Sequence, residues 1–369
     1  MIFDSESVFE ENVITVLKQH GWKDGVLRYP TERDLLDNWK DILYRNNNDI
    51  DRLGKYPLTD GEMAQIIEQI ETLRTPLALN SFVNGRTVSI TRDNKEDVAH
   101  FGKEVSLYIY DRKEIAGGKS TYQIVQQPVY PAKNTMLNSR RGDLVLLING
   151  MPLIHIELKK SGIPVSQATN QIEKYAHEGV FTGLFRLVQI FVAMTPDDAV
   201  YFANPGVDKF NPSYYFHWAD YNNEPICGGQ HPGKDEWKLF IGGTSGTAGL
   251  LSIPMAHQLI GFYTIADSAD GCLKVLRSYQ YIAANAISDV VRKCDWEQRP
   301  VTPGRPGGYV WHTTGSGKTM TSFKSAQLIA DSHDADKVVF LMDRIELGTQ
   351  SLKEYRSFAD SETEVQGTE

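Results

Sequence analysis

Cysteine, long apolar runs and positive charge are all scarce in this sequence, and each shortage excludes a class of protein. The three cysteines are Cys227, Cys272 and Cys294. They lie far apart and form no CxxC pair, which argues against a disulfide framework and against a cysteine-built zinc site. The most apolar long stretch, residues 183–194, is too short to span a bilayer. The N-terminus is acidic, whereas a secretory signal would be basic and then apolar. We therefore expect a cytoplasmic protein with no membrane partner.

The charge balance is acidic overall, with one basic segment. A formal net charge of −9 argues against a protein that binds nucleic acid through a surface that is basic all over. It does not exclude a local site, because affinity follows the local field. Between Lys133 and Lys160, five lysines and arginines stand against two carboxylates, Asp143 and Glu157. This segment is therefore basic within an acidic protein.

Length and periodicity predict two α/β units. At about 150 residues per domain, 369 residues correspond to about two to three domains, and a hydrophobic content of 41% is typical of folded chains. We expect a mixed sheet flanked by helices over residues 1–245, ended by the glycine-rich stretch 222–250, and the start of a second unit over 246–369. Helices are expected at 5–22, within 31–75, at 165–180, near Leu259, at 273–291 and at 318–330. Strands are expected within 80–160, within 183–205, at 308–311 and at 337–343.

Residues 307–330 have the order strand, glycine turn, helix, which is typical of a phosphate-binding loop. The segment HTTGSGKT fits the P-loop pattern, with His312 in place of its first glycine. The glycines let backbone N–H groups point at a phosphate, and the helix N-terminus adds its dipole. Lys318 would neutralise the β- and γ-phosphates of ATP, and Thr319 would hold its Mg²⁺. A plain glycine-rich connection between a strand and a helix is the alternative. The expected ATP contacts in the loop are Gly315, Ser316, Gly317, Lys318 and Thr319.

Two segments on either side of this loop resemble parts of superfamily 2 helicases. Gln280, upstream of the loop, can read the adenine edge with its amide donor and acceptor together. A glutamine with only a surface role is the alternative. Arg344 lies in DRIELGTQ, which resembles the Asp-Arg-x-x-Leu-x-x-Gln segment that touches the nucleic-acid backbone in that superfamily. Together the two segments predict binding of ATP and DNA.

A second motif combines Asp143 with Glu157-Leu158-Lys159. Metal-assisted phosphodiester hydrolysis needs carboxylates that converge on a divalent cation and a lysine beside the attacking water. Glu157 and Lys159 are two apart on an expected strand and therefore face the same side. By itself the pattern also fits a solvated edge strand.

Three further features favour a nuclease. The charged residues lie among apolar strand residues, and unpaired buried charge is costly without a metal. Gln171 and Tyr175 follow at i and i+4 on one helix face, within reach of the site or of DNA. Arg140 and Arg141 supply phosphate-binding charge beside the aspartate. Oxygen ligands without a cysteine or histidine cluster predict magnesium.

The hairpin that carries the motif sets a geometric condition. A three-residue connection over 149–151 would place Asp143 opposite Glu157. A two-residue Asn149-Gly150 turn would place the aspartate opposite Ile156, on the wrong face. We therefore expect a three-residue loop or a compensating bulge.

These residues resemble the PD-(D/E)XK nuclease core of the RecB-like type, with its QxxxY helix at Gln171 and Tyr175. Joined to the P-loop segment on one chain, the order resembles the restriction (R) subunit of type I restriction-modification enzymes. The resemblance implies a PD-(D/E)XK mixed sheet followed by a RecA-like P-loop domain. It implies that Asp143 and Glu157 hold Mg²⁺, that Lys159 assists the water, and that the two QxxxY residues support the site.

The resemblance also implies partners and a wider activity. An R subunit assembles with modification (methyltransferase) and specificity subunits, pumps duplex DNA with ATP, and cleaves foreign DNA far from the recognised site. Glu10 matches an acidic position that sometimes aids the metal, although it stands among glutamates that could all face solvent. Lys209 follows YFAN on a loop that, by a loose alignment, would face the motor.

Two other classes of function compete with this interpretation. One is a helicase-like ATPase or remodeller with an inert nuclease fold, and the other is a non-catalytic assembly module that binds ATP. The second acidic motif and the arginines of a second lobe, which such a motor needs, are both absent after Lys318. We therefore expect a truncated RecA-like domain and no ATP turnover by this chain alone.

Overall fold

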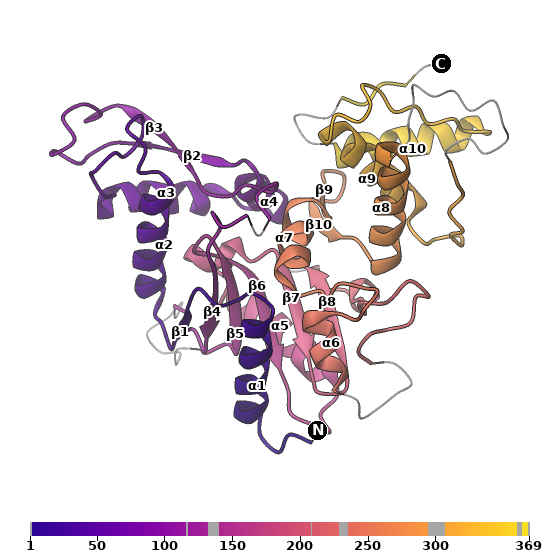
Figure 1. Ribbon diagram of the computed structural model, residues 1–369, viewed down its shortest axis with the longest axis horizontal. Helices are drawn as coiled ribbons and strands as arrows, with labels where there is room; N and C mark the ends of the chain where they lie inside the picture. Colours follow the sequence, from indigo (N-terminus) through magenta and orange to yellow (C-terminus); the bar gives the residue numbers. More distant parts are fainter. Residues whose placement is uncertain are drawn as a thin grey trace.

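The computed structural model describes residues 2–115, 117–131, 140–207, 209–228, 235–293, 307–359 and 364–367; Lys133 and Cys294 lie outside them. At its centre is a six-stranded mixed sheet in the order β1-β4-β5-β6-β7-β8 (Figure 1). The strands β1 and β4 are parallel, as are β6 and β7, and the other neighbours are antiparallel. The expected α/β class, a mixed sheet flanked by helices, is confirmed. The strands are β1 Val26–Arg28, β4 Tyr122–Gln126, β5 Leu144–Ile148, β6 Met151–Leu158, β7 Ile190–Met194 and β8 Ala199–Ala203.

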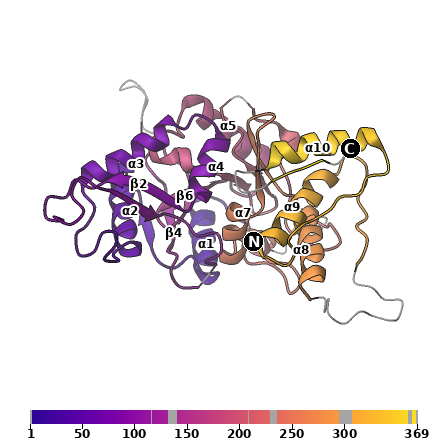
Figure 2. The ribbon, with the colours of Figure 1, turned by 90° about the horizontal axis from the view of Figure 1, so that it is seen from above.

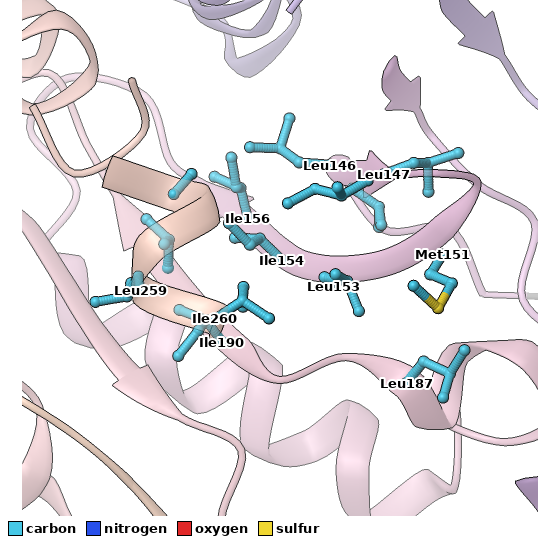
Figure 3. Packing of buried hydrophobic residues seen from close by; sticks show 14 of the residues in the cluster. Leu146, Leu147, Met151, Leu153, Ile154, Ile156, Leu187, Ile190, Leu259 and Ile260 are labelled. Atoms are coloured by element: carbon cyan, nitrogen blue, oxygen red, sulfur yellow. The ribbon is translucent and has the colours of Figure 1, made fainter. Parts of the chain in front are cut away.

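Both faces of this sheet are covered, which explains why its central strands are apolar throughout. Successive residues of β7 point to opposite faces. Phe191 and Ala193 pack with Ile172 of α5 (Val165–Glu178) in one cluster. On the other face, Ile190 lies near Leu259 of α7 (Ile253–Gly261), as Figure 3 shows. The helices α1 (Glu6–Gln19) and α6 (Glu236–Gly242) pack against each other beside that face.

Helix starts follow local capping chemistry. The Ser5 hydroxyl accepts a hydrogen bond from the Val8 amide at the start of α1. Thr31 and Thr59 form complete capping boxes at α2 (Glu32–Asn46) and α3 (Asp60–Thr72). Their hydrogen bonds explain why the polar stretch within 31–75 divides into two helices.

Helices α2 and α3, with α4 (Pro76–Asn84) and the antiparallel pair β2 (Thr87–Thr91) and β3 (Glu104–Tyr108), form one end of the molecule. Figure 2 shows α8–α10 at the opposite end. That end contains α8 (Ser278–Lys293), α9 (Lys318–Asp331), α10 (Ile345–Phe358) and the pair β9 (Thr264–Asp267) and β10 (Cys272–Val275). Two short 3-10 helices complete the described elements, η1 Gly183–Leu187 and η2 Pro212–Tyr214.

Three secondary-structure expectations are wrong, and one helix lies where none was expected. The glycine-rich stretch 222–250 includes helix α6, because Trp237 packs edge-on against Phe9 of α1. The first residues of the helix expected over 273–291 form β10 instead. The segments 308–311 and 337–343 were expected as strands but are not, and Leu341 is 95% exposed. No described strand lies beside either segment to pair its backbone, so its apolar pattern alone forms no ladder. Helix α7 includes Leu259, where a helix was expected, and it packs on the central sheet.

Candidate active site

The β5–β6 hairpin aligns the two acidic residues by means of a bulge. Its turn is the two-residue Asn149-Gly150, with φ of 52° and 84°, so the expected three-residue loop is wrong. The register starts with Ile148 opposite Met151 and then shifts between Leu146 and Leu147, so that Leu144 lies opposite Ile156. Continued by one residue, this register brings Asp143 level with Glu157. The expected compensating bulge is therefore confirmed.

The carboxyl group of Asp143 is held by the backbone of the partner strand. The amide of Leu158 donates a 2.7 Å hydrogen bond to Oδ2 of Asp143. Burial, and next the charge of Glu157, raises the pKa of Asp143. Burial also raises the pKa of Glu157, against the opposing effect of Lys159. The two carboxyl groups are therefore adjacent and short of compensating charge.

Lys159 lies against the same pair. Its Nζ is 3.2 Å from Oε1 of Glu157 and 3.6 Å from Oε1 of Glu6, and it donates to the Leu158 carbonyl at 2.8 Å. Burial opposes the charged form, but the charges of Glu157 and Asp143 raise the pKa of Lys159. The lysine therefore remains an ammonium ion that can orient a water molecule or a phosphate. It is not a proton acceptor in this arrangement.

Glu10 of α1 faces this site, so the solvent-facing alternative is wrong. Its side chain is 3% exposed, and its Oε2 accepts a 3.1 Å hydrogen bond from Gln127. Burial raises the pKa of Glu10, and the charge of Asp143 contributes in the same direction. Its Oε1 has no hydrogen-bond partner, and the same holds for Oε2 of Glu157. Two buried acidic oxygens near Asp143 therefore make no hydrogen bond among the described residues.

Helix α5 places the two QxxxY residues at the edge of the site. The Gln171 amide donates to the Tyr175 hydroxyl at 2.6 Å, and that hydroxyl donates to the Arg141 carbonyl at 2.8 Å. Burial, followed by the charge of Glu157, raises the pKa of Tyr175, which places the tyrosine beside the carboxylates. The pair thus joins α5 to the backbone just before Asp143.

The two arginines before Asp143 differ in their surroundings. Arg140 makes two 2.9 Å hydrogen bonds to the carboxylate of Glu178. Arg141 is exposed, with its guanidinium 5.9 Å from the centre of the Tyr29 ring. A hollow of about 340 Å³ opens on this side of α5. It is lined by Arg140, Asn170, Gln171, Lys174 and Tyr175.

The donor set of the site suits a hard cation. No group of three His, Cys, Asp or Glu side chains in the described part of the chain forms a ready-made metal cage. Magnesium does not need one, because it usually keeps several waters and binds one or two carboxylates together with substrate phosphates. Asp143 and Glu157 meet that requirement, and a divalent cation would supply the charge that their raised pKa values show to be lacking.

One buried pair beside the carboxylates escaped the sequence analysis. Tyr130 and His155 are hydrogen-bonded to each other at 2.9 Å, and Nε2 of His155 is 3.5 Å from Oε2 of Glu157. The histidine stands two residues before Glu157 on β6, but no spacing links Tyr130 to it. The bulge and the β4–β5 pairing bring them together, so only the folded register reveals the contact.

The glycine-rich loop over residues 312–319 has the backbone that its glycines predict. Gly315 and Gly317 adopt φ of 77° and 79°, and α9 begins at Lys318. The ammonium of Lys318 donates to the Thr313 carbonyl at 3.1 Å, within the loop itself. Thr319 occupies the first turn of the helix, where the P-loop pattern places it.

Gln280 contacts the loop directly. Its Nε2 lies 3.2 Å from both the Ser316 and the Gly317 carbonyl oxygens, and the Tyr279 hydroxyl donates to Ser316 at 2.9 Å. At 3% exposure, Gln280 is not a surface glutamine. Its amide holds the backbone of the turn.

The two remaining expected residues are Arg344 and Lys209. Arg344 is exposed at the residue before α10. Lys209 donates to the Asp270 carbonyl in the turn between β9 and β10. This bond joins the loop after β8 to the β9–β10 turn.

None of the described helices is long and apolar enough to cross a membrane.

Two known protein families match parts of this chain. Residues 4–210 match the family described as type I restriction enzyme R protein N terminus, and residues 279–369 match the SWI2/SNF2 ATPase family. The first match includes Asp143, Glu157 and Lys159, and the second includes the glycine-rich loop over residues 312–319. The chain belongs to the type I restriction enzyme R protein family.

Individual relatives carry the same designation. The chain is 31% identical over 365 residues to the type I restriction enzyme SsaAORF53P endonuclease subunit of Staphylococcus saprophyticus. It is 32% identical over 361 residues to the SauMSSORF170P endonuclease subunit of Staphylococcus aureus. Each alignment covers 97% of this chain and 34% of the relative, so the chain spans about a third of the length of these proteins. The EcoprrI endonuclease subunit of Escherichia coli is 27% identical over 343 residues, which are 85% of this chain and 99% of that protein.

Proposed function

We propose that this chain contains the DNA-cleaving centre of a type I restriction enzyme, a Mg²⁺-dependent endonuclease that acts on duplex DNA. The observation that carries the proposal is the bulged register, which brings Asp143 level with Glu157 beside Lys159. The names of the relatives, which are endonuclease subunits, support the same activity.

The residues of the site have distinct roles in this proposal. Asp143 and Glu157 hold Mg²⁺, which when bound polarises the scissile phosphate and lowers the pKa of a water molecule. The Lys159 ammonium orients the attacking water and stabilises negative charge on the phosphate. Glu10 adds a third carboxylate on the same side. Gln171 and Tyr175 fix the backbone that carries Asp143, and Arg140, Arg141 and Arg344 contact DNA phosphates.

Cleavage is coupled in the complete enzyme to ATP-driven translocation along DNA. The support is the match of the C-terminal residues to an ATPase family and the loop geometry at Gly315–Thr319. Gln280 and residues Gly315–Thr319 form the ATP site, with Thr319 next to its Mg²⁺. The partners are modification and specificity subunits, and the function is restriction of foreign DNA in the cytoplasm. The word "subunit" in the names of the relatives supports assembly with other chains.

The test separates the two activities in the assembled enzyme. Lys159→Ala and Glu157→Ala should abolish cleavage of an unmethylated plasmid and leave ATP hydrolysis intact. Lys160→Ala is the matched control, because Lys160 contacts the Asp4 carbonyl rather than the carboxylates. Lys318→Ala should abolish translocation and, with it, remote cleavage. Cleavage that persists in Glu157→Ala would disprove the nuclease assignment and favour a helicase-like ATPase or remodeller with an inert nuclease fold.

A further inference from the structure

The Tyr130–His155 pair lies beside the carboxylates but has no role in the proposed function. Both side chains are buried, with exposures of 1% and 0%. The rings of Tyr175, Phe181 and Phe191 stand edge-on around the imidazole. These rings exclude water from the imidazole.

The hydrogen bond to Tyr130 selects one tautomer of His155. An imidazole nitrogen that accepts a hydrogen bond carries no proton, so the ring proton lies on the other nitrogen. A buried phenol must place its own proton, and the contact that the structure gives that hydroxyl is Nδ1 of His155 at 2.9 Å. Nδ1 therefore accepts, and the ring proton lies on Nε2.

That proton is directed toward Glu157. Nε2 of His155 is 3.5 Å from Oε2 of Glu157, and both atoms are buried without a satisfied hydrogen bond. In this tautomer Nε2 carries a proton that it can donate to Oε2 of Glu157. Each atom then supplies the hydrogen-bond partner that the other needs. In the opposite tautomer, a lone pair on Nε2 of His155 would face a lone pair on Oε2 of Glu157. The Tyr130 proton would then have no acceptor.

We propose that Tyr130 and His155 form a chain of two hydrogen bonds that orients the Glu157 carboxylate for binding of Mg²⁺. Both are positioning residues, since they act through Glu157. The inference rests on the proposed function, because it takes Glu157 as a metal ligand. Groups that orient a metal ligand through a hydrogen bond commonly change metal affinity by about 10- to 100-fold when they are removed.

The chain offers a matched control for this contact. The Tyr122 hydroxyl and Nδ1 of His257 form a second buried tyrosine–histidine hydrogen bond, at 2.8 Å, and the His257 ring contacts no carboxylate of the site. Titration of MgCl₂ into the purified chain by calorimetry should show affinity about 10-fold weaker in Tyr130→Phe than in wild type. Tyr122→Phe should bind Mg²⁺ as the wild type does, although it loses the same kind of bond.

Two substitutions of His155 test the direction of the hydrogen bonds. His155→Gln keeps an acceptor for Tyr130 and a donor for Glu157, so its Mg²⁺ affinity should stay close to wild type. His155→Met fills the space without either group and should weaken binding at least as much as Tyr130→Phe. Unfolding midpoints measured in EDTA report any general loss of stability separately.

Each outcome decides a different point. Wild-type affinity in Tyr130→Phe, or equal weakening in Tyr130→Phe and Tyr122→Phe, would overturn the orienting role. Equal weakening in His155→Gln and His155→Met would overturn it as well. A wild-type chain that binds no Mg²⁺, or an Asp143→Asn variant that binds it undiminished, would instead overturn the proposed metal site itself.

Discussion

The backbone amide of Leu158 donates a 2.7 Å hydrogen bond to Oδ2 of Asp143, a residue 15 positions earlier in the chain. The aspartate is thus fixed by the main chain of the strand that carries Glu157. The bulge in β6 makes this possible, because without it the two-residue turn would direct the aspartate to the other face. The carboxylates are therefore brought together by backbone pairing rather than by flexible side chains.

The raised pKa of Asp143 predicts a stability cost in the absence of metal. Burial raises this pKa to about 8, above its unfolded value of about 3.9. The folded state then binds more protons than the unfolded state, so stability falls as the pH rises from about 4 to about 8. Asp143→Asn keeps an acceptor for Leu158 and removes the charge. It should raise the free energy of unfolding at pH 8 in EDTA by at least about 1.4 kcal/mol, the equivalent of one pKa unit, because the folded and unfolded pKa values differ by more than one unit.

Urea unfolding at pH 5 and pH 8, with EDTA or with Mg²⁺, measures this effect. Magnesium should stabilise the wild type at pH 8 and leave Asp143→Asn unaffected. Asp197→Asn removes an exposed carboxylate and should change neither quantity. A wild type that becomes more stable between pH 5 and pH 8 in EDTA, relative to Asp143→Asn, would contradict the prediction.

The tight hairpin turn should not tolerate a side chain at Gly150. A Cβ at this position would lie 2.8 Å from Cδ1 and 2.9 Å from Cα of Trp39, at a φ of +84°. Gly54 also has a positive φ, +52°, but nothing lies within 4 Å of its Cβ position. Gly54→Ala should therefore cost about 1 kcal/mol from backbone strain alone, and Gly150→Ala about 2–4 kcal/mol from strain and contact together. Denaturant unfolding of both variants checks the difference, and equal costs would show that the Trp39 contact relaxes freely.

The ion pair between Arg140 and Glu178 should limit DNA affinity. Both guanidinium hydrogen bonds go to that carboxylate, so the arginine must leave it to reach a phosphate. Glu178→Gln should tighten binding of a short duplex about threefold to tenfold at low salt, and Arg140→Ala should weaken it and lower the salt slope by about 0.9. Glu173→Gln, on the same helix, is the control because Glu173 pairs only with His177 among the described contacts. Fluorescence anisotropy over a salt series measures these effects, and weaker binding by Glu178→Gln would refute them.

The sequence predicts much of the central sheet because local and global signals agree there. Ser5 caps α1, period-two runs form β4–β6, and the QxxxY spacing places Gln171 next to Tyr175. The choice between a longer loop and a bulge depends on whether the turn fits against Trp39, which is distant in sequence. The Tyr130–His155 contact depends on that register in turn.

In the C-terminal part and at α6, the local sequence pattern did not predict the secondary structure correctly, for a different reason. Residues 308–311 and 337–343 alternate or run apolar as strands do, but a strand also needs a neighbour for its N–H and C=O groups. Helix α6 was missed because a short amphipathic turn among glycines has no strong periodicity, and its stability comes from Trp237 packing on Phe9.

The contacts of Gln280 predict how nucleotide binding should fail when it is changed. Its Nε2 donates hydrogen bonds to the Ser316 and Gly317 carbonyl oxygens, and its Oε1 accepts one from the Arg277 amide at 2.9 Å. Gln280→Glu keeps the acceptor but loses the donor and sets a carboxylate against two carbonyl oxygens. We expect it to weaken binding of a fluorescent ATP analogue about 10-fold, because a repelled loop no longer presents its N–H groups to the phosphates.

If Gln280 acts through the loop, binding of GTP should weaken by the same factor, since both nucleotides share the phosphates. If it reads adenine, the loss should be confined to ATP. Titration of both nucleotides into wild type and Gln280→Glu distinguishes the two roles, and unchanged affinity for both would exclude Gln280 from the nucleotide site.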